Sequence, residues 1–408
     1  MNHKESLDEL YSMNELEFEP GLKNMKALLK KLGNPEKKLR CIHVAGTNGK
    51  GSVCAMVSSV LADAGYNVGM YTSPHLKKFN ERIKMNRRLI SDKDVAEYYL
   101  KIKKYITNQS FFEITTAMAF LYFYDKNADF VVLEAGLGGR LDSTNVVKPL
   151  ISVITNISYE HTDRLGKTLR KIAYEKSGII KNHIPIVTGA SGIALRTIKR
   201  IAKGKNSKLH ALNEGQISKR FNKKKNEWSF DFGIYKNLSL SNLKGKFQVK
   251  NAAIAVKALE ILNRTNKIKI TYTNIKNGLS NAEWPGRFQY IEKNVLVDSA
   301  HNPGGFKVLF DELKNISYNR LILLVGFSKD KDVKKISQII SSNKKIGRII
   351  LTQSNNEKSM PIEDAKRYFK DGIAIRNSKK ALECAKKTAK KNDLVLVCGS
   401  IYLLGKII

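Results

Sequence analysis

Short apolar runs alternate with stretches of helical periodicity along most of this chain of 408 residues. The clearest case begins with an apolar run at 41–45 and continues through a loop at 46–52 that carries three glycines. The next segment, 50–64, is closed by Gly65 and places its apolar residues on one helical stripe, namely Val53, Met56, Val57, Val60, Leu61 and Ala64. Because parallel strands are joined by crossover helices, this alternation predicts an α/β fold with a mostly parallel sheet flanked by helices.

The same pattern continues toward the middle of the chain. A helix is expected at 167–180, and strands are expected at 130–133, 151–155 and 184–187. The segment 204–240 has lysine runs and alternates apolar with polar residues around Trp228, Phe230 and Phe232, which predicts an antiparallel hairpin. A further helix is expected to open near Asn251.

A Pro-Gly pair within 283–287 interrupts this pattern and predicts a linker. A second series of strands follows it, expected at 295–297, 321–325, 349–351 and 394–397. The chain is therefore predicted to contain two domains, an N-terminal one at 1–287 and a smaller, Rossmann-like α/β domain at 288–408.

The net charge of the chain is strongly positive. Lys and Arg number 72 against 37 Asp and Glu, which gives a formal charge of +35 at pH 7. A nucleic-acid-binding protein concentrates its basic residues on one face or in a tail, whereas the lysines here recur along the whole chain. We therefore expect no nucleic-acid partner, although a positive surface would concentrate acidic small substrates.

Cysteine content and the N-terminal segment indicate the compartment. The four cysteines show no C-x-x-C spacing and are too few for a disulfide framework. Residues 1–20 are rich in Glu and Asp and lack the apolar core of a signal peptide, and no run of about 18 apolar residues occurs. We expect a cytoplasmic protein that does not span a membrane.

The loop at 46–52 has the composition of a phosphate-binding loop. Its glycines let backbone N–H groups point at phosphate oxygens, the helix N-terminus adds a partial positive charge, and Lys50 adds a full one. The generic pattern G-x-x-x-x-G-K-[ST] is not met, because Val44 occupies its first glycine position and Gly51 stands in place of the hydroxyl residue. The candidate ATP-binding residues are Gly46, Thr47, Asn48, Gly49, Lys50, Gly51 and Ser52.

This variant loop resembles the ATP loop of the Mur ligase superfamily. The segments TSPHL at 72–76 and FNERI at 79–83 resemble one branch of it, the folylpolyglutamate synthases, which are often bifunctional with dihydrofolate synthase. The resemblance continues through LEAGLGGRLDSTN at 133–145, EH at 160–161, EKSG at 175–178 and DSAHNP at 298–303. It spans most of the chain and implies a Mur-ligase-type ATPase domain followed by a glutamate-ligase domain.

The resemblance implies two magnesium ions and a set of catalytic residues. One ion would lie on Ser73, Glu134 and His161, and Ser52 would bind the ion that bridges the ATP phosphates. In the family, the lysine of the E-K-[AS]-G motif is carbamylated, which turns a cation into a carboxylate that helps to hold a second magnesium; here that lysine is Lys176. The implied catalytic residues are Lys50, Glu134, His161 and Lys176.

The resemblance also implies contacts to the nucleotide and to the pterin substrate. It places Asn251 beside adenine, Arg287 at the phosphates, and Asp298 and His301 at the ribose or the incoming glutamate. Asn251 could also be an ordinary helix N-cap. The implied substrate-binding residues are Ser73, Pro74, His75, Arg82, Phe112, Glu113 and His301, although an aromatic pair before a helix is more often part of a core than a ligand contact.

These features together imply an ATP-dependent ligase that adds L-glutamate to a folate or a dihydropteroate through an acyl phosphate. Another Mur-type ligase that acts on a cell-wall precursor is the alternative, and the SPH and FNERI motifs disfavour it. We expect a monomer. The sequence does not distinguish a monofunctional from a bifunctional enzyme, and it does not give the preferred oxidation state of the pterin or the number of glutamates added.

Overall fold

The computed structural model describes residues 2–13, 21–224, 226–265, 268–354 and 356–408. Its largest sheet has eight strands in the order β4-β3-β2-β5-β1-β6-β7-β8. The strands are β1 (Cys41–Ala45), β2 (Val68–Tyr71), β3 (Ile83–Met85), β4 (Arg88–Leu89), β5 (Phe130–Glu134), β6 (Ile151–Ile154), β7 (Ile186–Thr188) and β8 (Leu209–Ala211). All neighbouring pairs are parallel except β2 with β3 and β3 with β4 at one edge. The predicted mostly parallel sheet is confirmed.

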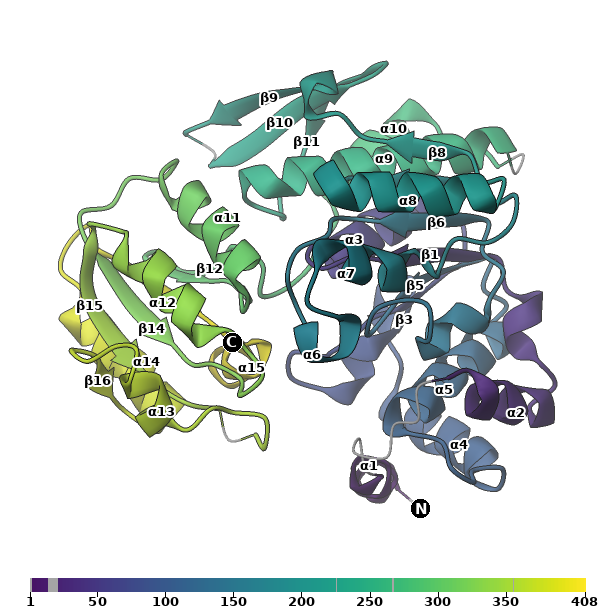
Figure 1. The fold of residues 1–408 in the computed structure, drawn as a ribbon, viewed down its shortest axis with the longest axis horizontal. Coiled ribbons are helices and arrows are strands. Elements are labelled where there is room, and N and C mark those ends of the chain that lie inside the picture. Colours follow the sequence, from purple (N-terminus) through teal and green to yellow (C-terminus); the bar gives the residue numbers. More distant parts are fainter. Residues whose placement is uncertain (1, 14–20, 225, 266–267, 355) are drawn as a thin grey trace.

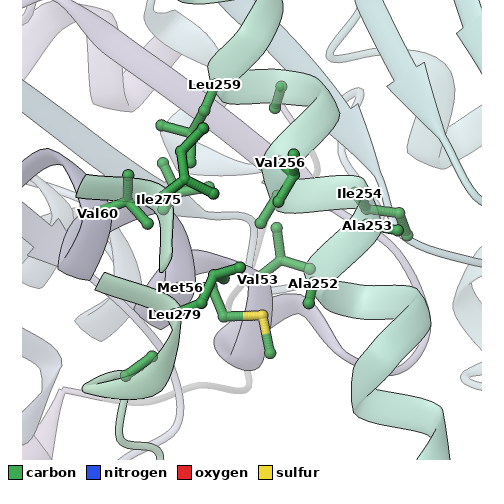
Figure 2. Close-up of a cluster of buried hydrophobic side chains, with 14 of the residues drawn as sticks. Val53, Met56, Val60, Ala252, Ala253, Ile254, Val256, Leu259, Ile275 and Leu279 are labelled. Carbon is green, nitrogen blue, oxygen red and sulfur yellow. The ribbon is translucent and has the colours of Figure 1, made fainter. Parts of the chain in front are cut away.

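Alternate residues of the central strands enter different cores, because successive side chains of a strand point to opposite faces. In β5, Phe130 and Val132 belong to one core and Val131 and Leu133 to another. The first core is covered by α3 (Lys50–Asp63), α9 (Lys246–Thr265) and α10 (Tyr272–Ser280). Figure 2 shows how Val53 and Met56 of α3 meet Ala252 and Val256 of α9 there.

The opposite face is covered by the helices α1 (His3–Ser12), α2 (Lys23–Lys31), α4 (Asp92–Lys103) and α5 (Phe111–Asp125). Three more helices follow β6: α6 (Thr162–Leu165), α7 (Leu169–Ser177) and α8 (Gly192–Gly204). The last two enclose a smaller core with Ile154 and Ile186 of the sheet. The sheet therefore lies between two helical layers (Figure 1).

The segment predicted to form a hairpin forms a three-stranded antiparallel sheet instead. Its strands are β9 (Ile217–Asn222), β10 (Glu227–Phe232) and β11 (Tyr235–Ser239), in the order β11-β10-β9. The alternating residues Trp228, Phe230 and Phe232 are buried in the same core as α9. The pattern thus gave the right strand type, and β11 adds a third strand that the prediction lacked.

A second sheet of six strands, in the order β12-β13-β17-β14-β15-β16, is formed by the C-terminal part of the chain. Its strands are β12 (Gln289–Glu292), β13 (Val295–Val297), β14 (Leu321–Val325), β15 (Ile346–Leu351), β16 (Ile373–Ala374) and β17 (Leu394–Cys398). Its helices are α11 (Pro303–Leu313), α12 (Val333–Ser341), α13 (Ile362–Lys366), α14 (Ser378–Thr388) and α15 (Ile401–Ile407). Only β12 pairs antiparallel, and Figure 1 shows this smaller α/β unit beside the large one. The predicted two-domain α/β class is confirmed.

One predicted helix begins earlier than expected. Helix α9 starts at Lys246, directly after Gly245. The φ of Gly245 is 102°, a conformation that cannot belong to a right-handed helix. Asn251 is therefore inside the helix, and the interpretation of Asn251 as an N-cap is wrong. Val249 explains the early start, because this residue of the first turns is buried in the first core.

No helix among the described residues is long and apolar enough to cross a bilayer.

Candidate active site

The loop between β1 and α3 depends on glycines for its path. Gly46 and Gly49 have φ values of 147° and 83°, which other residues rarely adopt. A Cβ atom at Gly49 would lie 2.6 Å from Oδ1 of Asn251, and one at Gly51 would lie 2.6 Å from the indole of Trp284. The loop is thus held against α9 on one side and the linker on the other, and α3 begins at Lys50.

Lys50 lies at the start of α3 with its side chain curled over the loop. Its Nζ donates to the carbonyl oxygens of Gly46 and Thr47, at 3.2 Å each, and lies 4.0 Å from Oε1 of Glu134. The lysine side chain is 15 % exposed. A positive charge is therefore held at the N-terminus of a helix, where the helix dipole also favours an anion.

Glu134 ends β5, the strand beside β1 in the sheet. Burial raises the pKa of its carboxyl group, while Lys50, the backbone N–H of Ser73 and Arg287 act in the opposite direction. The N–H of Ser73 donates to Oε2 of Glu134 at 3.3 Å. Ser73 and Glu134, which are predicted to share a magnesium ion, are thus in contact through the main chain of Ser73.

The segment after Ser73 carries the next of the predicted residues. A cis peptide bond joins Ser73 to Pro74, and Pro74 is exposed. Nε of Arg82 donates to Nδ1 of His75 at 2.9 Å. Burial, followed by Arg82, lowers the pKa of His75 to about 4, so its imidazole is neutral at pH 7.

The structure brings a loop of the C-terminal unit onto this site. Nε2 of His301 lies 2.8 Å from Oε1 of Glu160. Nδ2 of Asn302 donates to the same oxygen at 2.9 Å and to Oδ1 of Asn48 at 3.0 Å. Burial alone would raise the pKa of Glu160, but the hydrogen bond and charge of His301, with Lys50, hold it well below its usual range.

His161 lies beside an acidic residue that was not predicted. Its Nδ1 lies 3.8 Å from Oδ2 of Asp330, and its ring is 31 % exposed. Burial, then Lys331, lowers the pKa of His161 to about 4. Its described contacts do not include Glu134, and no three His, Cys, Asp or Glu side chains cluster as metal ligands within the described ranges.

Lys176 lies on α7 and is almost completely buried, at 3 % exposure. Its Nζ donates to the carbonyl oxygen of Gly46 at 2.8 Å. Burial, followed by the charge of Lys50, lowers its pKa to about 7, and nearby carboxylates oppose this shift. Most lysines of the chain lie at the surface, whereas Lys176 is buried and contacts the glycine loop.

Asn251, Ser52 and Asp298 are also predicted to bind the nucleotide, and each has hydrogen-bond partners in the structure. Nδ2 of Asn251 donates to Oε1 of Gln248 at 2.9 Å, and Nε2 of Gln248 donates to Oγ of Ser52 at 3.2 Å. Asp298 is buried, accepts from the N–H groups of Phe288 and Ala300, and has a pKa raised by burial and opposed by Arg287.

Phe112 and Glu113 lie at the start of α5. A Cβ at Gly136 would lie 2.6 Å from Cζ of Phe112, so this ring covers the loop after Glu134. Oε2 of Glu113 accepts from the N–H and hydroxyl of Ser110 and forms the capping box of the helix. Glu113 therefore has a structural contact in addition to any role toward a substrate.

Several residues that hold the loop were not predicted. Asn156 follows β6, accepts from the N–H of Asn48 at 3.0 Å and donates to its carbonyl oxygen at 3.0 Å. Ser158 and Thr47 bond to each other through main-chain and side-chain atoms. Because β6 neighbours β1 in a parallel sheet, polar residues directly after β6 could have been predicted to meet the loop.

Comparison with known families identifies the class. The Mur ligase middle domain matches residues 44–259, and the glutamate ligase domain of Mur ligases matches residues 286–401. The first match alone covers more than half of the chain and includes the glycine loop, Glu134 and Lys176. The chain thus has the domains and the fold of a Mur-type ligase.

Individual relatives of this chain identify the branch of the Mur ligases to which it belongs. The dihydrofolate synthase/folylpolyglutamate synthase of Bacillus subtilis is 37 % identical over 95 % of this chain and 94 % of its own length. A folylpolyglutamate synthase structure from Thermotoga maritima is 37 % identical, covers 99 % of this chain and 95 % of its own, and has a TM-score of 0.82. Escherichia coli FolC in complex with DHPP and ADP is 28 % identical, with coverages of 100 % and 97 % and a TM-score of 0.89. The chain belongs to the dihydrofolate synthase/folylpolyglutamate synthase family of Mur ligases.

Proposed function

We propose that this chain is an ATP-dependent ligase that joins the amino group of L-glutamate to a carboxylate of a folate or a dihydropteroate, releasing ADP and phosphate. One observation carries the proposal: the glycine loop with Lys50, the buried Glu134 and the His301–Asn302 loop of the C-terminal unit meet at one place. The names of the relatives, and the ADP held by the E. coli enzyme, support the choice of substrates.

The reaction needs a carboxylate oxygen to become a leaving group. An oxygen of the substrate carboxylate attacks the γ-phosphorus of ATP, and the bond from that phosphorus to the oxygen of ADP breaks. The amine of glutamate then attacks the carbon of the acyl phosphate, and phosphate leaves as the amide forms. Phosphoryl transfer of this kind depends mainly on positioning and on neutralising the charge of the phosphate oxygens.

The residues of the chain divide this work. Lys50, with the backbone N–H groups of the loop, binds the β- and γ-phosphates, and Arg287 reaches them from the linker as a planar, permanently charged donor. Asn251 holds the adenine edge through an amide that both donates and accepts. Asp298 and His301 contact the ribose or the incoming glutamate, and His75 and Arg82 face the folate.

Magnesium fits the donor set at this site. Glu134 is a buried carboxylate that lies beside Ser73 and the charge of Lys50, and carboxylate and hydroxyl oxygens are ligands that Mg²⁺ prefers. Ser73, Glu134 and His161 would hold one ion, and Ser52 would hold the ion that accompanies ATP. When bound, Mg²⁺ supplies positive charge that neutralises phosphate oxygens.

Lys176 is proposed to carry a carbamate. Carbon dioxide reacts with a neutral amine, and a pKa of about 7 leaves a large fraction of Lys176 neutral at pH 7. The bond from nitrogen to carbon forms as the amine releases a proton to solvent, and the product is an anion with two oxygens, which would remove the repulsion between Lys176 and Lys50.

The domain division after Arg287, a monomeric state and a cytoplasmic location remain predictions.

The function is tested by measuring ADP formation by the purified chain with Mg-ATP. We expect ADP, and no AMP, only when L-glutamate is present together with dihydropteroate or tetrahydrofolate. Side-by-side assays with these two acceptors separate a bifunctional from a monofunctional enzyme. Formation of AMP, or ADP release that does not depend on glutamate, would overturn the proposal.

A further inference from the structure

A cavity of about 290 Å³ lies between helix α3, the turn joining β3 to β4, and the linker that precedes Gly286. This size is near the lower end of the range typical for small-molecule sites, about 300–1,000 Å³. The cavity is not lined by any of the residues proposed to bind ATP, magnesium, folate or glutamate. It is therefore separate from the candidate active site, and the proposed reaction gives it no role.

Two cations line this cavity and face little opposite charge. They are Lys84 of β3 and Arg87 of the following turn, and the linker contributes one carboxylate, Glu283. Neither cation has a carboxylate oxygen within 4.0 Å in the part of the chain that the structure describes. Burial lowers the pKa of Lys84, which Glu81 and Glu283 oppose from a distance. Such a wall attracts an anion.

The wall also offers a hydroxyl group with nothing to bind. Oγ of Ser58, which lines the cavity, is buried and has no hydrogen-bond partner among the described residues. Leaving a buried polar group without a hydrogen bond is unfavourable. The neighbouring Ser59 is fully engaged, because its Oγ donates to the carbonyl oxygen of Gly278 and accepts from Arg87. Donation from Ser58 to a ligand therefore requires its side chain to rotate into the cavity, because Oγ itself has almost no accessible surface.

The turn that carries Arg87 has an unusual sequence for its shape. Asn86 and Arg87 have φ values of 49° and 68° between two antiparallel strands. Two-residue turns with positive φ at both positions strongly favour Asn-Gly, because a side chain at the second position is sterically strained. Arg87 adopts this strained conformation, and its Nη2 donates to Oγ of Ser59 at 2.9 Å. Backbone strain of this kind concentrates at ligand sites.

We propose that this cavity binds a small anion through a carboxylate or phosphate group, held by Lys84, Arg87 and the hydroxyl of Ser58. The cavity is one side chain away from the nucleotide-binding loop. Nζ of Lys84 lies 5.2 Å from the centre of the Trp284 ring, and the same indole packs on Gly51 of the loop. An anion that draws the ammonium group of Lys84 changes the electrostatic environment of Trp284.

Fluorescence of Trp284 provides the test. The chain has two tryptophans, so a Trp228→Phe background leaves Trp284 as the only tryptophan, and excitation at a wavelength that tyrosine does not absorb isolates its emission. With saturating Mg-ADP present, we expect inorganic phosphate or succinate to change this emission saturably. Saturation by succinate alone assigns a carboxylate ligand, saturation by phosphate alone assigns a phosphate ligand, and saturation by both assigns the shared anionic chemistry.

Arg87→Gly is the decisive variant, because glycine suits the positive φ and the protein should still fold. We expect this variant to raise the anion concentration at the midpoint of the fluorescence change about tenfold or more, since a hydrogen bond from a charged group contributes about 1.5–3 kcal/mol. Lys84→Met should act similarly, and Arg88→Gly, the matched neighbour outside the cavity, should leave the midpoint unchanged. The proposal is overturned by no saturation, by an equal midpoint in Arg87→Gly, or by a signal that only Lys50→Ala removes, which would place the anion at the nucleotide loop.

Discussion

At the scale of single residues, the candidate site depends on charges that are buried beside the glycine loop. Lys50 and Lys176 both donate to the carbonyl oxygen of Gly46, and Glu134 lies 4.0 Å from Lys50. Burial raises the pKa of the carboxyl and lowers that of Lys176, so both charged forms are costly without a ligand. A triphosphate with magnesium supplies the charges that would balance them.

Replacement of Lys50 tests the phosphate contact. Lys50→Ala is expected to lower kcat by about 10²–10³, because removal of one preorganised donor to a developing charge has an effect of this size. Steady-state ADP formation measures it, and Lys30→Ala, an exposed lysine on α2, serves as the control. A Lys50→Ala variant with the original rate would exclude Lys50 from catalysis.

Replacement of Glu134 tests the metal site. Glu134→Gln keeps the shape of the side chain and removes its charge, so the magnesium concentration for half-maximal rate should rise at least about tenfold. Magnesium titration of the rate measures this effect. Glu97→Gln, in an exposed helical ion pair with Lys101, should leave the titration unchanged. An unchanged curve for Glu134→Gln would remove Glu134 from the metal site.

The lowered pKa of Lys176 predicts how the free energy of unfolding changes with pH. Its pKa is about 7 in the folded chain against the ordinary 10.5, so between these values the unfolded chain holds a proton that the folded chain lacks. The free energy of unfolding should therefore rise with pH across this window, by about 2 kcal/mol from pH 7 to 9 in carbon-dioxide-free buffer. Lys176→Met should lose this rise in urea unfolding at the two pH values. An equal rise in both proteins would contradict the burial of a titrating Lys176.

At the scale of elements, local patterns predicted the type of each segment better than its ends. The strand at 41–45 and the helix after the glycine loop are as predicted, because the first is a short apolar run ended by a glycine loop and the second has its apolar residues at helical spacing. The start of α9 was misplaced because Gly245, not the polar Asn251, ends the preceding segment. The antiparallel edge strands β3, β4 and β12 were not predicted, because two- to four-residue strands carry too little periodicity.

The contact between the loop after β5 and α7 depends on a glycine. A Cβ at Gly178 would overlap the backbone of Arg140, whose N–H donates to the carbonyl of Glu175 at 2.8 Å. Gly178→Ala should therefore destabilise the protein by about 1–3 kcal/mol. The matched variant Gly204→Ala, at the end of α8 with no atom within 4 Å, should be neutral or up to about 1 kcal/mol stabilising. Urea unfolding of both compares them, and equal stabilities would contradict the packing described.

At the scale of the whole molecule, the site is assembled from two units that are far apart in the sequence. The contacts of Asn302 with Asn48 and of His301 with Glu160 cross from one sheet to the other. The motifs alone could place each residue on a loop at a strand end. They could not show that Glu160 forms hydrogen bonds with both His301 and Asn302 of the C-terminal unit, or that His161 lies beside Asp330. These contacts depend on how the two units pack.

The central claim is that the glycine loop holds ATP while its terminal phosphoryl group passes to an organic acid. The most direct measurement uses a folate or dihydropteroate acceptor labelled with ¹⁸O in its reacting carboxylate, with analysis of the released phosphate by mass spectrometry. The account predicts one ¹⁸O atom in each phosphate formed, because the carboxylate oxygen leaves with the phosphoryl group. Phosphate free of label, formed together with the amide product, would contradict it.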